Sequence, residues 1–301
     1  MLEGLDTRLL VDLLRDRMNP SKALGQHYLV DDEVIERSIR LTEEFASPLS
    51  TDSHVLEVGP GPGSLTLALL RSQSRVTAIE IDKQSVEHLD RVFRESKESL
   101  DIEEADAVSE RWPEGITHII SNLPYQISSP IVDRITKYHS SEPIQLSILL
   151  VQEEFAQRMA MFSAPYDVGP LGLNLWLDFD VSMDRRVSPS SFSPSPRVQS
   201  RLVVLKPATR PEAEGTNRQL FRIITRHCFA NRRRKMRTLL SKPPSRISRV
   251  SGWHRDRWKE SASKLISMGH PGLEDGWADL RPENLEPEDW IKIVEAISSD
   301  G

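Results

Sequence analysis

Between residues 54 and 207 the sequence alternates short apolar runs rich in β-branched residues with longer runs of helical character. Strands are predicted at residues 54–59, 75–82, 100–106, 117–122, 145–152 and 200–207, and helices at 65–72, 83–100 and 128–138. Strands separated by helices of this length predict βαβ units, and hence a mostly parallel sheet covered on both faces. The expected fold class is therefore α/β. Ligands of such sheets bind at the carboxyl ends of the strands.

A chain of 301 residues is long enough for two domains. Ser and Pro become frequent at residues 187–200, one more strand follows, and the polar stretch PATRPEAEG comes after it. We place the boundary there. The first domain is predicted to span residues 1–207 and the second, small and helical, residues 208–301.

Several classes of protein are disfavoured by the sequence. No apolar run approaches eighteen residues, and the amino-terminal stretch mixes Asp and Arg with its leucines, so neither a membrane protein nor a secretion signal is expected. Cys228 is the only cysteine and cannot form an internal disulfide. Without a Cys or His cluster at ligand spacing, we expect no metal. A cytoplasmic location fits these features.

Charge is distributed unevenly along the chain. The net charge is −6, yet residues 206–260 hold sixteen Lys/Arg and four Asp/Glu, a local balance of +12. The densest stretch, RHCFANRRRKMR at 226–237, is typical of a surface that binds a phosphate backbone, although a solvated helix face is the alternative. We predict phosphate contacts without base reading for Arg232, Arg233, Arg234, Lys235 and Arg237.

A glycine-rich turn, EVGPGPG at 57–63, lies between a predicted strand and a predicted helix. Gly59 and Gly61 permit a tight turn and a close approach of a ligand to the backbone, and Glu80 ends the next strand, where a carboxylate can accept both hydroxyls of a ribose. The G-x-G-x-G spacing favours S-adenosylmethionine over NAD, and the absence of a P-loop Lys disfavours a triphosphate.

Two further strand ends carry polar residues. Asp106 ends the third strand, where it can accept a hydrogen bond from the amino group of a cofactor adenine; an ordinary turn is the alternative. Asn122, Leu123, Pro124 and Tyr125 end the fourth strand. The Asn122 side-chain oxygen and the Pro124 carbonyl can accept both N–H bonds of an adenine amine, and Tyr125 can stack on the base. Alone, this tetrapeptide is more often a structural turn.

Taken together, these segments resemble the ribosomal small-subunit RNA adenine N6,N6-dimethyltransferases over nearly the whole chain. The resemblance rests on LGQHYLVD (24–31), EVGPGPGSLT (57–66), AIEID (78–82), EAD (104–106), NLPYQISSPI (122–131), VQEEFAQRM (151–159), SFSPSPRVQS (191–200), FANRRRKMR (229–237) and RPENL (281–285). It implies a Rossmann-like methyltransferase domain with a seven-stranded sheet, followed by a small helical RNA-binding domain.

The resemblance also implies site roles. Cofactor contacts fall on His27, Leu29, Gly59, Gly61, Glu80, Asp106 and Asn122, and contacts with the target base on Asn122, Pro124, Tyr125 and Phe192. His27 stands where the family most often has Asn. The implied reaction uses S-adenosyl-L-methionine to dimethylate two adjacent adenosines near the 3′ end of small-subunit rRNA, within an immature subunit, and we expect a monomer.

Three alternatives are compatible with parts of the sequence. A large-subunit rRNA adenine N6-methyltransferase shares the strand-end motifs, although the basic segment and RPENL favour the small-subunit branch. A non-catalytic assembly factor of the same fold would not need the glycine turn, Glu80 and Asn122, which are all present. An NAD-linked oxidoreductase leaves Asn122 and Tyr125 without a role.

Overall fold

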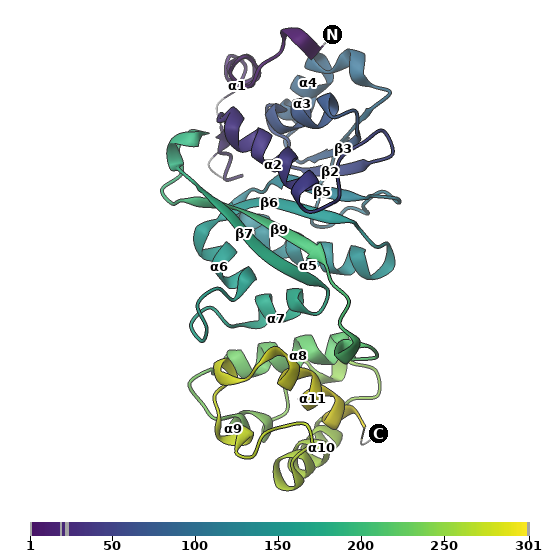
Figure 1. The fold of residues 1–301 in the computed structure, drawn as a ribbon, viewed down its shortest axis with the longest axis vertical. Helices are drawn as coiled ribbons and strands as arrows, with labels where there is room; N and C mark the ends of the chain where they lie inside the picture. Colours follow the sequence, from purple (N-terminus) through teal and green to yellow (C-terminus); the bar gives the residue numbers. More distant parts are fainter. Residues whose placement is uncertain (1, 19, 22–23, 300–301) are drawn as a thin grey trace. The chain divides into compact units, whose positions relative to one another are not determined.

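The computed structural model describes residues 2–18, 20–21 and 24–299 (Figure 1). Its contacts divide the chain into two compact units, a sheet unit of residues 1–156 and 180–207 and a helical unit of residues 157–179 and 208–301. One of the divisions between the two units falls after residue 207. The predicted first domain, 1–207, differs in one segment, because 157–179 belongs to the helical unit. Leu173 and Leu177 of that segment are buried in one apolar core with Phe221 and Trp258.

The sheet unit is built on seven strands in the order β4-β3-β2-β5-β6-β9-β7. Their bounds are β2 His54–Val58, β3 Arg75–Glu80, β4 Leu100–Glu104, β5 His118–Asn122, β6 Leu146–Gln152, β7 Phe179–Val187 and β9 Ser200–Pro207. Strands β2 to β6 pair in parallel, and β9 pairs antiparallel with β6. The expected α/β class is confirmed.

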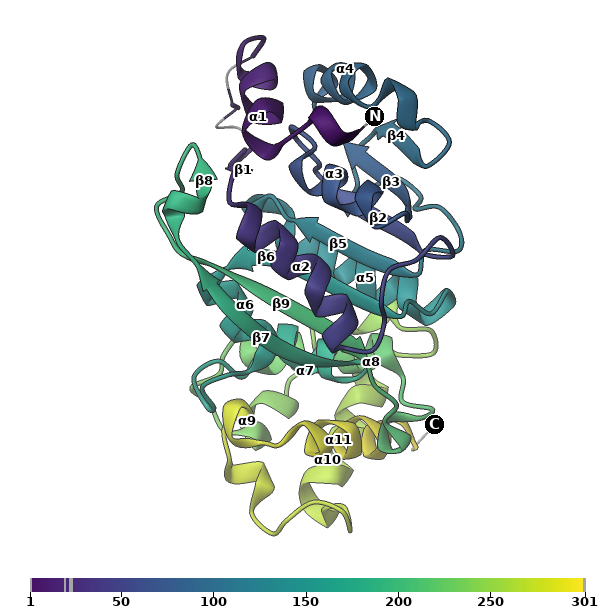
Figure 2. The same ribbon diagram turned by 45° about the horizontal axis from the view of Figure 1, so that its top comes forward.

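Helices cover both faces of the sheet. Those of the sheet unit are α1 Thr7–Arg15, α2 Asp32–Glu44, α3 Ser64–Arg71, α4 Lys83–Val92 and α5 Ser128–Ser141, and α6 Glu153–Ala160 leads into the helical unit. Helix α2 crosses in front of the strands while α5 lies behind them (Figure 2). Helix α4 begins where Asp82 accepts a hydrogen bond from the Gln84 N–H, and it ends at Val92, earlier than predicted, before a short 3-10 turn.

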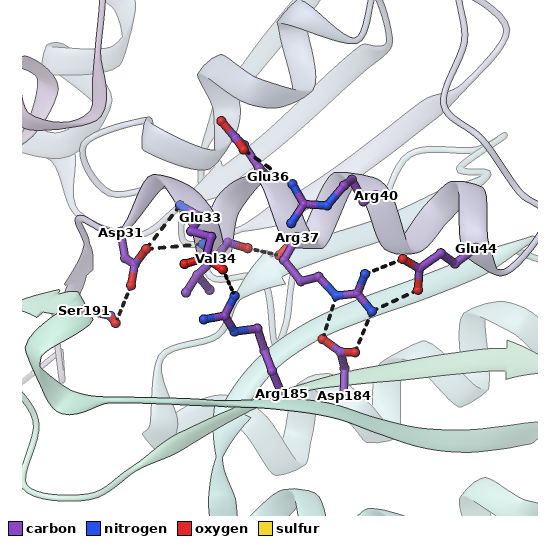
Figure 3. Close-up of polar contacts among 11 residues, drawn as sticks. Asp31, Glu33, Val34, Glu36, Arg37, Arg40, Glu44, Asp184, Arg185 and Ser191 are labelled. Carbon is purple, nitrogen blue, oxygen red and sulfur yellow. Dashed lines mark hydrogen bonds and ion pairs between the residues drawn. The ribbon is translucent and has the colours of Figure 1, made fainter.

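Strand β7 was not predicted from the residues. Most of its residues are only partly buried, and it carries Asp184 and Arg185, so its sequence is like that of a polar loop. These charges bond to α2 (Figure 3): Arg37 donates to Asp184 at 2.7 Å and pairs with Glu44, while Arg185 donates to Glu33 at 2.6 Å. The Arg37 guanidinium lowers the pKa of Asp184. Charged side chains on an edge strand also discourage pairing with another chain.

A two-stranded ribbon connects distant segments of the sheet unit. Strand β1, Tyr28–Leu29, pairs antiparallel with β8, Phe192–Ser193, so that Leu29 lies opposite Phe192. Asp31, which caps α2, also accepts a hydrogen bond from the Ser191 hydroxyl at 2.7 Å (Figure 3). The segment before the sheet is thereby held against the Ser/Pro-rich segment.

The helical unit contains α7 Pro170–Trp176, α8 Arg218–Phe229, α9 Met236–Leu240, α10 Arg255–Met268 and α11 Pro287–Ser298. Its core includes two fully buried tryptophans, Trp258 and Trp290. No strand occurs in the described residues from 208 to 299, as expected for a helical second domain. None of the helices described is long and apolar enough to cross a membrane.

Gly63 offers a test of how the glycine turn is packed. Its φ is +88°, and a Cβ there would lie 2.5 Å from the buried Phe93 ring and 2.9 Å from Leu89. We expect Gly63→Ala to lower the free energy of unfolding by the cost of a left-handed alanine, about 1–2 kcal/mol, plus about 1–3 kcal/mol for overpacking. Gly115→Ala, with φ +74° and nothing within 4 Å, is the control that has only the first cost. Equal losses in urea unfolding would show that the Phe93 contact is unimportant.

Candidate active site

A pocket opens at the carboxyl ends of the central strands, wholly within the sheet unit. Its wall is formed by the glycine turn after β2, the end of β3, the turn after β4, the end of β5 and the segment before β1. Of the predicted residues, those that line the pocket are His27, Leu29, Gly59, Gly61, Glu80, Asp106, Asn122, Pro124 and Tyr125. The structure therefore brings together residues that are far apart in the sequence.

The glycine turn is held tightly against its neighbours. Gly59 has φ +69°, and a Cβ on it would lie 3.2 Å from the Pro124 ring. Gly61 has φ +56°, and its Cβ would lie 3.1 Å from the Tyr28 ring. Side chains at these positions would strain the backbone and crowd the pocket wall. Both glycines are thus required by geometry.

Two buried carboxyl groups lie at the base of the pocket. Glu80 accepts hydrogen bonds from the Gly61 N–H at 3.2 Å and the Asp82 N–H at 2.9 Å. Burial raises the pKa of Glu80, and these two N–H donors oppose the rise. Glu57, on β2, accepts a hydrogen bond from the Thr66 hydroxyl at 2.6 Å, and burial raises its pKa to about 8. The raised pKa means that Glu57 keeps its proton to a higher pH than an exposed glutamate, and a protonated carboxyl group can be buried without a cationic partner.

The Asn122 carboxamide has a defined orientation at the end of β5. Its Nδ2 donates a hydrogen bond to the His27 carbonyl at 3.3 Å. No donor from the described part of the chain reaches its Oδ1. The side chain lines the pocket with an acceptor that has no protein partner. That arrangement suits a ligand with an N–H group.

The two residues after Leu123 already have partners. The Pro124 carbonyl accepts hydrogen bonds from the Ile127 N–H at 3.1 Å and the Ser128 hydroxyl at 3.3 Å, so both of its lone pairs are in use. The Tyr125 hydroxyl bonds to the buried Ser200 at 2.7 Å, and burial raises its pKa. Tyr125 is thereby fixed in place, while Pro124 must exchange a partner before it can accept from a ligand.

His27 connects three parts of the pocket wall. Its ring stacks on Tyr125 with centroids 5.7 Å apart, and its Nδ1 donates to the Pro194 carbonyl at 2.7 Å. Because a carbonyl only accepts, Nδ1 carries a proton. This residue links the segment before β1 to the end of β5 and to the segment after β8.

Phe192, which the resemblance places beside the target base, is not among the residues that line the pocket. It is 3% exposed and belongs to the apolar core of the sheet unit. The pairing of β1 with β8 directs it into the core opposite Leu29, which does line the pocket. Its contact with the pocket is indirect.

The segments after β3 and β4 give the pocket an apolar and a polar side. Strand β4 ends at Glu104, so Asp106 lies two residues beyond the strand, and its carboxylate accepts a hydrogen bond from the Val108 N–H at 2.9 Å. Ile81, half exposed, and Ala107 also line the pocket. An exposed isoleucine in a pocket is suited to the face of an aromatic ring.

The predicted phosphate-binding residues lie in the helical unit, mainly in the turn between α8 and α9 rather than on one helix face. Arg232 donates to the carbonyls of Pro165 and Tyr166 and pairs with Glu283 at 3.6 Å. Lys235 and Arg237 both pair with Asp279. Arg233 and Arg234 are exposed, and their guanidinium groups bond to no other described residue. Among the five predicted phosphate-binding residues in the described part of the chain, these are the two whose charged groups are not engaged.

Residues missed by the sequence analysis also shape the pocket. Gln26 donates to Asp82 at 2.9 Å and accepts from the Tyr28 hydroxyl at 3.1 Å. Glu57 stood inside the quoted glycine motif without a role, although a carboxyl within an apolar strand already indicates a buried acid. No group of three or more metal-ligating side chains occurs in residues 2–18, 20–21 and 24–299.

The fold is similar to two solved structures. One is a dimethyladenosine transferase from Plasmodium falciparum, with TM-score 0.72 and 22% identity, covering 89% of this chain and 96% of that one. The other is the 23S rRNA methyltransferase ErmE, with TM-score 0.63 and 24% identity, covering 90% and 99%. Together with the order of the strands, these likenesses define the class as Rossmann-like α/β proteins with a pocket at the carboxyl ends of the strands.

Sequence comparison gives the family. Residues 17–250 match the ribosomal RNA adenine dimethylase family. The chain is 33% identical to a probable ribosomal RNA small subunit methyltransferase A of Thermococcus gammatolerans, over 98% of this chain and 95% of that protein. It is 40% identical to the protein of the same name in Haloarcula marismortui, over 70% and 72%. The chain belongs to the ribosomal RNA adenine dimethylase family and is a methyltransferase.

Glu57 predicts a particular dependence of stability on pH. Between pH 4.5 and about 8 the folded protein keeps a proton on Glu57 that the unfolded chain releases, so this group's stabilising contribution falls as the pH rises through that range. Glu57→Gln cannot titrate. The difference in free energy of unfolding, native minus variant, should fall by on the order of 1 kcal/mol per pH unit across this range. A difference that stays constant from pH 5 to 8 in urea titrations would contradict the assignment.

Proposed function

We propose that this methyltransferase dimethylates the N6 amines of two adjacent adenosines near the 3′ end of small-subunit rRNA. The observation that carries the proposal is the Asn122 carboxamide, whose nitrogen is engaged by the His27 carbonyl while its oxygen lines the pocket without a donor. The names of the relatives support the small subunit as the source of the RNA. The substrate we propose is RNA within an immature subunit, bound by a monomer in the cytoplasm.

S-adenosyl-L-methionine is the cofactor that this pocket fits. Glu80, buried and held by two backbone N–H groups, is placed to accept the ribose hydroxyls. Ile81 and Ala107 offer apolar contact to an adenine ring, and Asp106 an acceptor for its amine. Gly59 and Gly61 let the methionine part approach the backbone, next to His27 and Leu29. When bound, the cofactor supplies an electrophilic methyl group on a sulfonium sulfur.

The chain's own residues then position the target amine. The Asn122 oxygen accepts one N–H of the adenine amine, which favours a nitrogen with its lone pair directed at the methyl group. The Pro124 carbonyl accepts the other N–H once the Ser128 hydroxyl has turned away. Tyr125, fixed by Ser200 and covered by His27, stacks on the extruded base. Phe192 supports Leu29 from the core. Positioning is the main source of the rate gain, since no strong base is needed.

The large-subunit alternative is less well supported. The likeness to ErmE is structural, at 24% identity, and concerns the fold. The relatives that cover most of this chain bear small-subunit names. A non-catalytic assembly role gives no reason for an unpaired acceptor in the pocket.

Asn122→Ala tests the proposal. Removing the acceptor should lower methyl incorporation into immature small subunits by on the order of 100-fold, because the variant loses the side-chain oxygen that holds the target amine in position. The measurement compares the transfer of labelled methyl groups by the variant and by the native protein, with the two shown to have equal thermal stability. Asn284→Ala, at an exposed asparagine outside the pocket, is the control and should keep full activity. Retention of activity by Asn122→Ala would refute the mechanism.

The basic turn makes a separate prediction about RNA affinity. Arg233 and Arg234 are free to bind phosphates, whereas Lys235 and Arg237 share Asp279. Replacing Arg233 and Arg234 with Gln should flatten the slope of log affinity against log salt by about 1.4 to 1.8, as expected for two lost phosphate contacts. The matched double variant of Lys235 and Arg237 should change the slope less. The reverse ranking would show that the ion pairs with Asp279 open on binding.

A further inference from the structure

The loop between α6 and α7, residues 161–169, exposes two aromatic side chains in the helical unit. Tyr166 is 81% exposed, the highest value among the large hydrophobic side chains described, and Phe162 in the same loop is 63% exposed. The phenol ring of Tyr166 has little to cover it. Aromatic rings exposed to this degree are typical of surfaces that bind a partner.

One arginine, Arg232, connects the loop to the basic turn between α8 and α9. The Arg232 guanidinium donates to the Pro165 carbonyl at 3.1 Å and to the Tyr166 carbonyl at 3.4 Å. On its other side it pairs with Glu283 at 3.6 Å and lies 5.9 Å from the centre of the Phe229 ring. All of these groups belong to the helical unit. Arg232 therefore positions the loop, and its donors are occupied by protein acceptors.

The two residues that follow Arg232 in the chain supply unpaired positive charge. Arg233 and Arg234 are exposed, and neither contacts an acidic group in the described part of the chain. The one acidic residue of the loop, Asp167, accepts a hydrogen bond from the Ser163 N–H at 3.1 Å and is used within the loop. An exposed aromatic ring in a loop that is bonded to Arg232, followed in the chain by two free guanidinium groups, is complementary to a polyanion with accessible ring faces.

We propose that this surface, Tyr166 with Arg233 and Arg234, binds an unpaired nucleotide of the substrate RNA. The Tyr166 ring stacks on the base, and the two arginines hold the adjoining phosphates. Duplex RNA hides the faces of its bases, so the occupant is a loop or bulge. The inference rests on the proposed function and adds a second point of RNA recognition, in the helical unit, to the base held in the pocket of the sheet unit.

Tyr166→Ala and Tyr166→Phe test the stacking contact. Filter binding of immature small subunits at several salt concentrations should show Tyr166→Ala weakened by roughly 5- to 150-fold, the range for loss of one stacked base, with an unchanged salt slope. Tyr166→Phe keeps the ring and should bind as the native protein does. Met268→Ala, which removes a 76% exposed apolar side chain from α10 of the same unit, is the matched control and should have no effect.

Three other outcomes would contradict the inference or the proposed function. Affinity of Tyr166→Ala equal to that of Met268→Ala would overturn the inference while leaving methyl transfer by the native protein intact. A native dimer by light scattering that Tyr166→Ala converts to monomer would also overturn it, since a second copy of the chain would then be the occupant. Native protein that neither binds nor methylates small subunits would overturn the proposed function as well.

Discussion

The hydrogen bond from the Asn122 nitrogen to the His27 carbonyl determines what the pocket can recognise. A carboxamide has a donor end and an acceptor end, and this bond uses the donor end within the protein. The acceptor end is left for a ligand that carries an N–H. His27 is itself held by Pro194 and by stacking on Tyr125, so the orientation of Asn122 depends on segments before β1, after β5 and after β8. The orientation of the Asn122 side chain therefore depends on residues as far apart in the sequence as His27 and Pro194.

The parallel sheet explains why these groups meet. Strands β2, β3 and β5 end at one edge, which brings the glycine turn, Glu80 and Asn122 to the same pocket. Burial at this edge favours neutral carboxyl groups, as the raised pKa of Glu57 shows. Backbone N–H groups compensate Glu80 instead of a cationic side chain. The base of the pocket is thus built without a fixed positive charge that would repel a sulfonium.

Much of this arrangement was predictable, because β-branched runs and glycine spacing are local signals. The parallel sheet and the pocket position of Glu80 and Asn122 follow from them. Three features did not follow. Strand β7 carries charged side chains, such as Asp184, that form ion pairs with α2. Helix α2 is far from β7 in the sequence, so no local pattern indicates these contacts. Phe192 faces the core because of the register of β8 with Leu29, which no local pattern encodes. The engagement of the Pro124 carbonyl depends on backbone geometry rather than residue type.

The contacts of the basic segment could not be predicted for a similar reason. The amino-acid composition gives the number of charged residues but not which of them form ion pairs. Asp279 and Glu283, which lie 42 to 51 residues later in the chain than their partners, bind three of the five cations. The most direct test of the whole account is to incubate the protein with a methyl-labelled donor and each ribosomal subunit separately, and to map the modified nucleotides. The account predicts two methyl groups on each of two adjacent adenosines near the 3′ end of the small-subunit RNA. Label confined to the large-subunit RNA, or absent from both, would contradict it.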